Sequence, residues 1–172
     1  MYISEQHQKV VLNLRQPERV LATIPSAKKF WFKGQELVAV PHRLDETTVL
    51  NNLGLKVPSP IVKQYNWPAS GSRTPFKAQL ETAGFMSLHS RAFVLSDMGC
   101  GKTLSLLWAY DYLKSLGKAN RMLVASPLST LERTWADEIF RNFPHLNVGV
   151  LHGSREKRLA LLENEDVDIF VV

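Results

Sequence analysis

The sequence predicts an α/β protein, in which a partial lobe with a mainly parallel sheet follows a small α+β module. From residue 74 onward, short apolar runs alternate with segments of helical periodicity, which is typical of parallel strands joined by helices. Residues 1–56 instead combine short paired strands with two short helices. Residues 57–73 lie in a stretch rich in proline and small polar residues. We therefore predict two folded parts, 1–56 and 74–172, joined by a linker.

The N-terminal part is expected to be a small sheet with two helices. Residues 9–14 (KVVLNL) predict a strand, and Pro17 suits the first turn of a helix that follows it. Residues 30–40 (FWFKGQELVAV) predict two short strands around a Lys-Gly-Gln turn. We expect a second helix with Asp45 as its N-cap and Gly54 at its C-terminal end.

The C-terminal part is expected to alternate helices and strands. The apolar run at 92–96 (AFVLS) is continuous, as in a strand buried on both faces of a parallel sheet. Ser129 and Glu132 have the spacing of a capping box at the start of a helix. The expected elements are helix 74–90, strand 92–96, helix 102–117, strand 121–126, helix 129–143, strand 147–152, helix 154–164 and strand 167–172.

The composition favours a reduced intracellular protein. The 172 residues include one cysteine, Cys100, which excludes an intramolecular disulfide. No apolar run approaches the roughly 18 residues of a membrane-spanning helix, and the N-terminus lacks the pattern of a signal peptide. We expect a cytoplasmic location, with association to the nucleoid if the source is prokaryotic or viral; a nuclear location is left open.

Positive charge is concentrated in the first part of the chain. The net charge is +5, and residues 1–75 hold ten Lys and Arg against five Asp and Glu, whereas the rest of the chain is balanced. A basic module beside a neutral one suggests a polyanionic partner, most simply nucleic acid. An ordinary solvated surface explains the same charge, and charge alone does not separate the two.

Residues 96–103 (SDMGCGKT) predict a phosphate-binding loop. Its glycines let the backbone curl, so that N–H groups of the loop and of the following helix face a phosphate. A chance turn is disfavoured, because an apolar run precedes the loop and a long helix follows it. The lysine would reach the β- and γ-phosphates, and the threonine hydroxyl would complete a magnesium shell. The predicted ligands are ATP and Mg²⁺, held by Ser96, which stands where a glycine is usual, and by Asp97, Met98, Gly99, Cys100, Gly101, Lys102 and Thr103.

Four segments, in order along the chain, resemble motifs of the SNF2-type DNA translocases, within helicase superfamily 2. The loop at 96–103 resembles the family's motif I, which also lacks the first glycine. Residues 122–144 (MLVASPLSTLERTWADEIFRNFP) resemble the motif Ia region, and residues 148–158 (VGVLHGSREKR) resemble the strand that follows it. Residues 74–86 (TPFKAQLETAGFM) resemble the helix that carries the family's adenine-reading glutamine. The resemblance implies that 74–172 is the first part of a RecA-like ATP-binding lobe.

The same resemblance implies a role for individual residues. Gln79 would read the adenine edge, for which its amide has both a donor and an acceptor, although a solvated helix glutamine is the alternative. Lys102 and Thr103 would be the catalytic residues of this segment, with Thr103 on the magnesium ion. Ser129 and Thr130 would hold a phosphate of DNA, and the capping role of Ser129 is compatible with this. The implied partner is duplex DNA, bound mainly through its backbone.

Hydrolysis needs residues beyond a phosphate loop. An acid pair after a strand must hold magnesium and orient the attacking water, and an arginine must stabilise the transition state. The nearest candidate, NEDVDIFVV at 164–172, has its acids before the strand. We therefore expect an N-terminal portion of an ATP-dependent DNA translocase or helicase, truncated before its Asp-Glu box and missing the C-terminal remainder of the motor. Such a chain would bind nucleotide weakly and would not turn it over.

Two other functions are weighed against this one. A non-catalytic nucleic-acid-binding protein with a vestigial loop-bearing lobe is the alternative. A kinase for small molecules is disfavoured by the Pro-Leu-Ser segment at 127–129. Within the N-terminal part, residues 28–33 (KKFWFK) interleave lysines with aromatics, as on a surface for nucleic acid, but a small domain also needs aromatics for its core.

Overall fold

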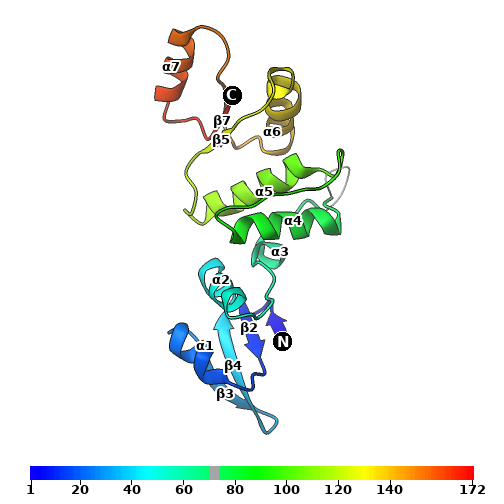
Figure 1. The fold of residues 1–172 in the computed structure, drawn as a ribbon, viewed down its shortest axis with the longest axis vertical. Coiled ribbons are helices and arrows are strands. Elements are labelled where there is room, and N and C mark those ends of the chain that lie inside the picture. The colour runs from blue at the N-terminus through cyan, green and yellow to red at the C-terminus, as the bar shows by residue number, and fades with distance from the viewer. Residues whose placement is uncertain (70–73) are drawn as a thin grey trace. The chain divides into compact units, whose positions relative to one another are not determined.

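The computed structural model describes residues 1–69 and 74–172, which form two compact units (Figure 1). Unit 1 consists of Met1–Trp67 with Ala83–Phe93, and unit 2 consists of Pro68–Thr82 with Val94–Val172. The last four residues of the predicted linker, 70–73, lie outside the described residues. Among the residues described, no helix is long and apolar enough to cross a membrane.

Unit 1 is built on an antiparallel sheet of four strands in the order β1-β2-β4-β3. The tight turn between β3 and β4 places Lys33 and Gly34 in the left-handed region, with φ of 49° and 75°. The elements of the unit are β1 (Tyr2–Ser4), β2 (Lys9–Leu12), α1 (Pro17–Thr23), β3 (Lys28–Phe32), β4 (Gln35–Pro41), α2 (Leu44–Asn52) and α3 (Ile61–Gln64). The predicted α+β module is therefore present, with β1 and α3 as elements that the sequence pattern did not indicate.

Helices α1 and α2 supply the apolar side chains that cover one face of this sheet. Val10 on β2 and Val38 on β4 are buried against Val20 of α1 and Leu50 of α2, in one hydrophobic cluster. Alternate residues of a strand point to opposite faces, so the residues between these buried positions belong to the other face of the sheet.

The ends of α2 differ in how well the sequence predicted them. The helix begins at Leu44, with Arg43 as an N-cap that makes no side-chain hydrogen bond, so the prediction of Asp45 as N-cap is wrong. Asp45 lies in the first turn, where its negative charge interacts favourably with the helix dipole and stabilises the helix. Gly54 follows the helix with φ of 87°, the left-handed conformation expected of a glycine at a helix C-terminus.

The segment after α2 packs closely against the second half of helix α4 (Lys77–Leu88), which belongs to the same unit. Ile61 is fully buried, and the hydroxyls of Ser59 and Ser87 form a buried hydrogen bond of 2.7 Å. Gly84 lies so close to Ser59 that a Cβ on it would be in van der Waals contact with that side chain, at 3.5 Å. Residues 57–67 are thus part of a packed unit, and the boundaries at 56 and 74 stay a prediction.

Unit 2 contains a parallel sheet of three strands in the order β5-β7-β6, which confirms the predicted α/β class. The strands pair in register, with Leu123, Phe170 and Gly149 side by side. The elements are the first half of α4, α5 (Lys102–Ser115), β5 (Met122–Val124), the 3-10 turn η1 (Leu128–Thr130), the π-helical turn η2 (Leu131–Ala136), α6 (Asp137–Asn142), β6 (Val148–Val150), α7 (Arg155–Glu163) and β7 (Ile169–Val171).

Two sequence predictions for residues 92–143 are wrong. Residues 92–96 form no strand, and Phe93 and Leu95 are 89% and 95% exposed. A strand requires a neighbour for its backbone hydrogen bonds, and none of the described strands pairs with this run. The expected helix 129–143 is instead three short segments, η1, η2 and α6, and no side-chain cap forms at their starts, so the capping box at Ser129 is absent.

Asp168, just before β7, joins α5 to the sheet. Lys114 Nζ lies 2.7 Å from its Oδ1, and the Asn147 N–H donates to its Oδ2 at 2.8 Å. The Tyr110 hydroxyl donates to the Asp168 carbonyl at 3.0 Å, and burial with the nearby Asp168 and Asp111 charges raises the pKa of Tyr110 to about 12. Burial pushes the pKa of Asp168 upward, but hydrogen bonds from Lys114 and from the Asn147 N–H outweigh it, so this pKa lies below its usual value.

Replacing Asp168 by Asn should therefore destabilise unit 2 in a pH-dependent way. The amide keeps an acceptor for the Asn147 N–H but loses the charge that Lys114 binds, so we expect the free energy of unfolding to fall by about 1–2 kcal/mol at pH 7. Because the folded pKa is depressed, the wild-type advantage is present above the unfolded pKa of about 3.9 and is lost as the pH falls through the folded value. Urea unfolding of both proteins at pH 7 and pH 3 measures this, and an equal difference at both pH values would contradict it.

Candidate nucleotide site

The loop at 96–103 has the backbone that the sequence predicted for it. Gly99 and Gly101 adopt left-handed φ values of 80° and 73°, which other residues rarely adopt. Gly101 is the N-cap of α5, so the 14-residue helix begins at Lys102 and directs its free N–H groups toward the loop. The helix dipole adds a positive potential at the same place. Loop and helix together provide the donors that a phosphate group requires.

The Lys102 ammonium is held by the loop itself. Its Nζ donates to the carbonyl oxygens of Ser96 at 2.8 Å and of Asp97 at 2.7 Å. A phosphate would offer the same cation charged oxygens in place of these two neutral ones, and charge-assisted hydrogen bonds are the stronger kind. The side chain therefore has partners now and better ones when a polyphosphate is present. Ser96 and Asp97 take part through their backbones, whereas the side chains of Met98 and Cys100 are exposed.

Gln79, on the first half of α4, lies against the loop. Its side chain is 7% exposed, so the alternative of a solvated helix glutamine is wrong. The amide oxygen accepts a hydrogen bond of 2.9 Å from the Phe76 N–H, and the amide nitrogen touches the position where Gly101 would carry a Cβ. The structure thus brings Gln79 and the loop together across 22 residues of sequence, and a role toward adenine stays a prediction.

A cavity of about 280 Å³ opens beside the loop. The loop and the start of α5 provide one wall, and two residues that the sequence did not single out, Thr134 of η2 and Glu138 of α6, provide another. Both lie within the segment 122–144 that resembles the motif Ia region, but the sequence did not assign them a place beside the loop, which they reach through the packing of the chain. The cavity is lined by Gly99, Gly101, Lys102, Thr103, Leu104, Thr134 and Glu138.

The donor set beside the loop suits a magnesium nucleotide better than a metal held by protein alone. The described residues contain no group of three or more His, Cys, Asp and Glu side chains that could hold a metal ion. Thr103 and Glu138, whose side chains carry oxygen atoms, are among the residues that line the cavity, and magnesium prefers a few such ligands together with phosphate oxygens and water. The predicted place of Thr103 on magnesium therefore fits the residues present.

The predicted DNA-contact pair, Ser129 and Thr130, lies on the turn η1. The Thr130 hydroxyl is engaged, since it donates to the Pro127 carbonyl at 2.7 Å and shares a hydrogen bond with Ser126. The Trp135 indole N–H also donates to Ser126, at 3.2 Å, so this cluster holds η1 against η2. Ser129 is exposed, which leaves its hydroxyl available to a ligand.

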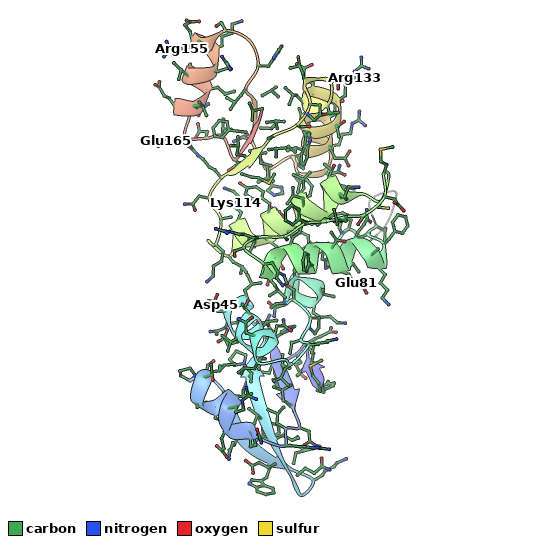
Figure 2. All side chains as sticks on the ribbon, viewed as in Figure 1. Asp45, Glu81, Lys114, Arg133, Arg155 and Glu165 are labelled. Atoms are coloured by element: carbon green, nitrogen blue, oxygen red, sulfur yellow. The ribbon has the colours of Figure 1, made fainter. Side chains whose placement is uncertain are left out.

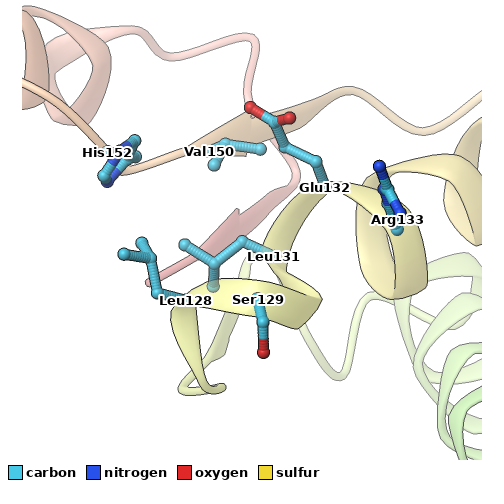
Figure 3. Close-up of a pocket in the computed structure, with 7 residues that line it drawn as sticks. All are labelled: Leu128, Ser129, Leu131, Glu132, Arg133, Val150 and His152. Atoms are coloured by element: carbon cyan, nitrogen blue, oxygen red, sulfur yellow. The ribbon is translucent and has the colours of Figure 1, made fainter.

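A second hollow, of about 190 Å³, lies between this turn and the end of β6 (Figure 3). Ser129 projects from the turn on the side away from Leu131 and Glu132, whereas His152 lies across the hollow beyond β6. The polar groups of this hollow therefore do not converge on one point. It is lined by Leu128, Ser129, Leu131, Glu132, Arg133, Val150 and His152.

Comparison with known proteins yields a consistent set of matches. The sequence profile of the SNF2-related domain matches residues 7–172, which include most of unit 1. The ISWI chromatin-remodeling complex ATPase ISW1 of Saccharomyces cerevisiae is 34% identical over 110 residues, which are 59% of this chain and 10% of that protein. The ATP-dependent DNA helicase DDM1 of Arabidopsis thaliana is 39% identical over 66 residues, which are 38% of this chain and 8% of that protein. The chain thus spans about a tenth of the length of these relatives.

The contact between Gln79 and Gly101 can be tested with a pair of glycine variants. Gly99→Ala and Gly101→Ala share the strain of a left-handed alanine, about 1–2 kcal/mol, but only at Gly101 would the added Cβ meet another side chain, with Gln79 Cδ 3.1 Å away. We expect Gly101→Ala to lower the free energy of unfolding by at least about 1 kcal/mol more than Gly99→Ala does, because Gln79 loses its place. Urea denaturation measures both.

Gly99→Ala and Gly101→Ala should lower the free energy of unfolding equally once the side chain of Gln79 is removed. In a Gln79→Ala background the two alanine substitutions should have equal effects to within about 0.5 kcal/mol, because the two sites then no longer share a contact. A difference that persists in this background would show that Gln79 is not what distinguishes the two glycines.

Proposed function

The chain belongs to the SNF2-related domain family, and we propose that it forms the ATP-binding N-terminal portion of an SNF2-type, ATP-dependent DNA translocase or helicase. The observation that carries this proposal is the contact between the Gly-Lys-Thr loop and Gln79, within a chain that matches the family from residue 7 to residue 172. A loop on a helix N-terminus supports phosphate binding by itself. The buried glutamine beside it adds a group that suits the base of a nucleotide.

ATP with Mg²⁺ is the proposed ligand, and the residues of this chain have separate tasks in holding it. Backbone N–H groups around Gly99 and Gly101 would bind phosphate oxygens, and Lys102 would leave its two carbonyl partners to bind them as well. Thr103 would bind magnesium through its hydroxyl. Gln79 would direct its amide to adenine. Bound ATP would supply a phosphoanhydride bond whose hydrolysis drives motion along DNA.

DNA is the proposed partner, chiefly through its phosphate backbone. The curated relatives are named as chromatin-remodeling ATPases and a DNA helicase, which supports an association with DNA inside the cell. On this chain Ser129, with its exposed hydroxyl on η1, is the proposed backbone contact, and Thr130 orders the turn that presents it. Such contacts are independent of base sequence and weaken as salt increases.

The 172-residue chain alone is proposed to bind nucleotide without turning it over. Glu138 is the one acidic side chain among the described residues that line the cavity, and no arginine is among them. Hydrolysis of ATP by motors of this kind needs a second acid for the metal and water, and a cation at the transition state. The activity of the family therefore requires groups beyond those that this cavity contains.

Nucleotide binding should depend strongly on Lys102. In a titration with a fluorescent ATP analogue and Mg²⁺, we expect Lys102→Ala to raise the Kd by at least about tenfold, because charge-assisted hydrogen bonds to phosphate are lost. Lys157→Ala, on the exposed face of α7, removes an equal charge in the same unit and should leave the Kd within about twofold. Equal affinities for all three proteins would refute the proposed site.

Turnover by the isolated chain should be undetectable. A phosphate-release assay with saturating Mg-ATP and added duplex DNA should give the same rate for the wild type and for Lys102→Ala, namely the background rate. If the wild type hydrolysed ATP steadily and Lys102→Ala abolished this, the proposed division between binding and hydrolysis would be wrong.

A further inference from the structure

The exposed face of the unit 1 sheet carries a set of side chains that the proposed ATP site does not involve. We call it the open face, and define it by six residues: Tyr2, Lys9, Lys28, Phe30, Phe32 and the adjoining Lys33. The opposite face of the same sheet is covered by α1 and α2 and forms the core of the unit. The open face belongs entirely to unit 1.

Strand register assigns these residues to one face. Tyr2 pairs with Val11, Val11 pairs with Ala39, and Ala39 pairs with Lys28, so that one row crosses all four strands. Directly paired residues share a face, and residues two apart along a strand share it as well. Lys9, Phe30 and Phe32 follow from this rule. The buried residues Val10 and Val38 lie at the alternate positions and confirm the assignment.

Aromatic rings are exposed at both edges of the open face. Tyr2 on the edge strand β1 is 67% exposed, and Phe32 on the edge strand β3 is 56% exposed. Phe30 is half-buried and lies two residues from Phe32, about 7 Å along the strand. The alternative that the aromatics of residues 28–33 serve the core of a small domain is therefore wrong for Trp31 and Phe32, which are 72% and 56% exposed. Flat rings exposed on a rigid sheet are platforms on which bases can stack.

The charged side chains of the open face are all lysines, so its charge is positive. Lys9 and Lys28 are exposed on it, and the Lys33 ammonium lies 5.4 Å from the centre of the Phe32 ring. None of the strand positions that share this face is acidic. A ligand that complements the face has to combine flat apolar rings with regularly spaced negative charges.

The nearby acids are paired outside the open face. Glu18 and Glu36 lie 2.9 Å and 2.7 Å from Lys29, whose side chain is on the helix-covered side of β3. Glu5, next to the end of β1, lies 2.8 Å from Lys63. These ion pairs leave the lysines of the open face without a described acidic partner, so their charge is available to a polyanion.

We propose that the open face binds single-stranded nucleic acid, with bases on Phe30, Phe32 and Tyr2 and phosphates on Lys9, Lys28 and Lys33. Unpaired bases expose both of their faces to an aromatic ring, whereas the bases of a duplex are stacked on one another and present only their edges in the grooves. The proposed contacts are stacking on aromatic rings and ion pairs with phosphates, and none of them reads the edge of a base. Binding is therefore expected to tolerate different base sequences. This site differs from the backbone contact proposed for the motor, and each can be tested without the other.

The test uses the full 172-residue chain and a fluorescein-labelled oligodeoxythymidine in the absence of nucleotide. Phe32→Ala should raise the Kd about tenfold, because one stacking contact is lost. Replacing Lys9 or Lys28 by Gln should lower the slope of log affinity against log salt by about 0.7 for each lysine, the value for single strands. Duplex DNA of the same length should compete weakly for the labelled strand.

Neighbouring residues supply matched controls. Trp31 is 72% exposed and adjacent to Phe32, but it points to the opposite side of β3, so Trp31→Ala should leave the Kd within about twofold. Lys56→Gln removes an exposed charge of unit 1 outside the sheet and should leave the salt slope unchanged. Circular dichroism verifies that each variant is folded.

The Lys102→Ala variant separates this proposal from the ATP site. It should bind the single strand as the wild type does, whether or not the wild type binds ATP. The proposal is overturned if the chain does not bind the single strand at 100 mM salt, if Phe32→Ala binds as the wild type does, or if Trp31→Ala and Phe32→Ala weaken binding equally. Preferential binding of duplex DNA, or of a protein partner through Phe32, would overturn it as well.

Discussion

Unit 2 presents its candidate site because one position in the chain carries no side chain. Gly101 combines a left-handed backbone with a close contact to the Gln79 amide, and a methyl group there would meet both constraints at once. The loop can therefore turn into α5 while α4 approaches it from the side. The Phe76 N–H donates to the oxygen of the same amide, so that the glutamine is held at one end by a backbone hydrogen bond and lies against Gly101 at the other. The proposed nucleotide site depends on this packing as well as on the charge of Lys102.

Local patterns in the sequence were sufficient for the parts of this structure that are decided locally. The glycines of the loop, the start of α5 and the turn after α2 at Gly54 all follow from conformational preferences of a few residues. Residues 92–96 show the limit of that reasoning: apolar composition indicates a strand, but a strand exists only with a neighbour to receive its hydrogen bonds. Glu138 was missed for a related reason, since its place beside the loop is set by tertiary packing.

In the N-terminal unit the sequence identified a run of lysines and aromatic residues, but it did not indicate on which face of the sheet each of them lies. The run KKFWFK at 28–33 was compatible with a core or with a binding surface, and the difference depends on which residues of the strand face the helices. The register between β3 and β4 places Lys29 and Trp31 on one side of the sheet and Lys28, Phe30 and Phe32 on the other, and both Trp31 and Phe32 are exposed. Figure 2 draws the side chains of the described residues on the ribbon. Register is fixed by long-range pairing and by the burial of one face. Once it is known, the aromatic residues separate into two classes with different surroundings.

The hydrogen bonds from Lys102 to two carbonyl oxygens of its own loop would affect which anions the loop can bind. In the free protein the ammonium is already bound by Ser96 and Asp97, which are covalently tethered to it and so compete at a high effective concentration. A small anion with one binding group must displace these partners in exchange for a single contact. A triphosphate has several further groups that engage the loop and the helix terminus at the same time. At the proposed site the lysine would therefore favour long polyphosphates over sulfate and inorganic phosphate.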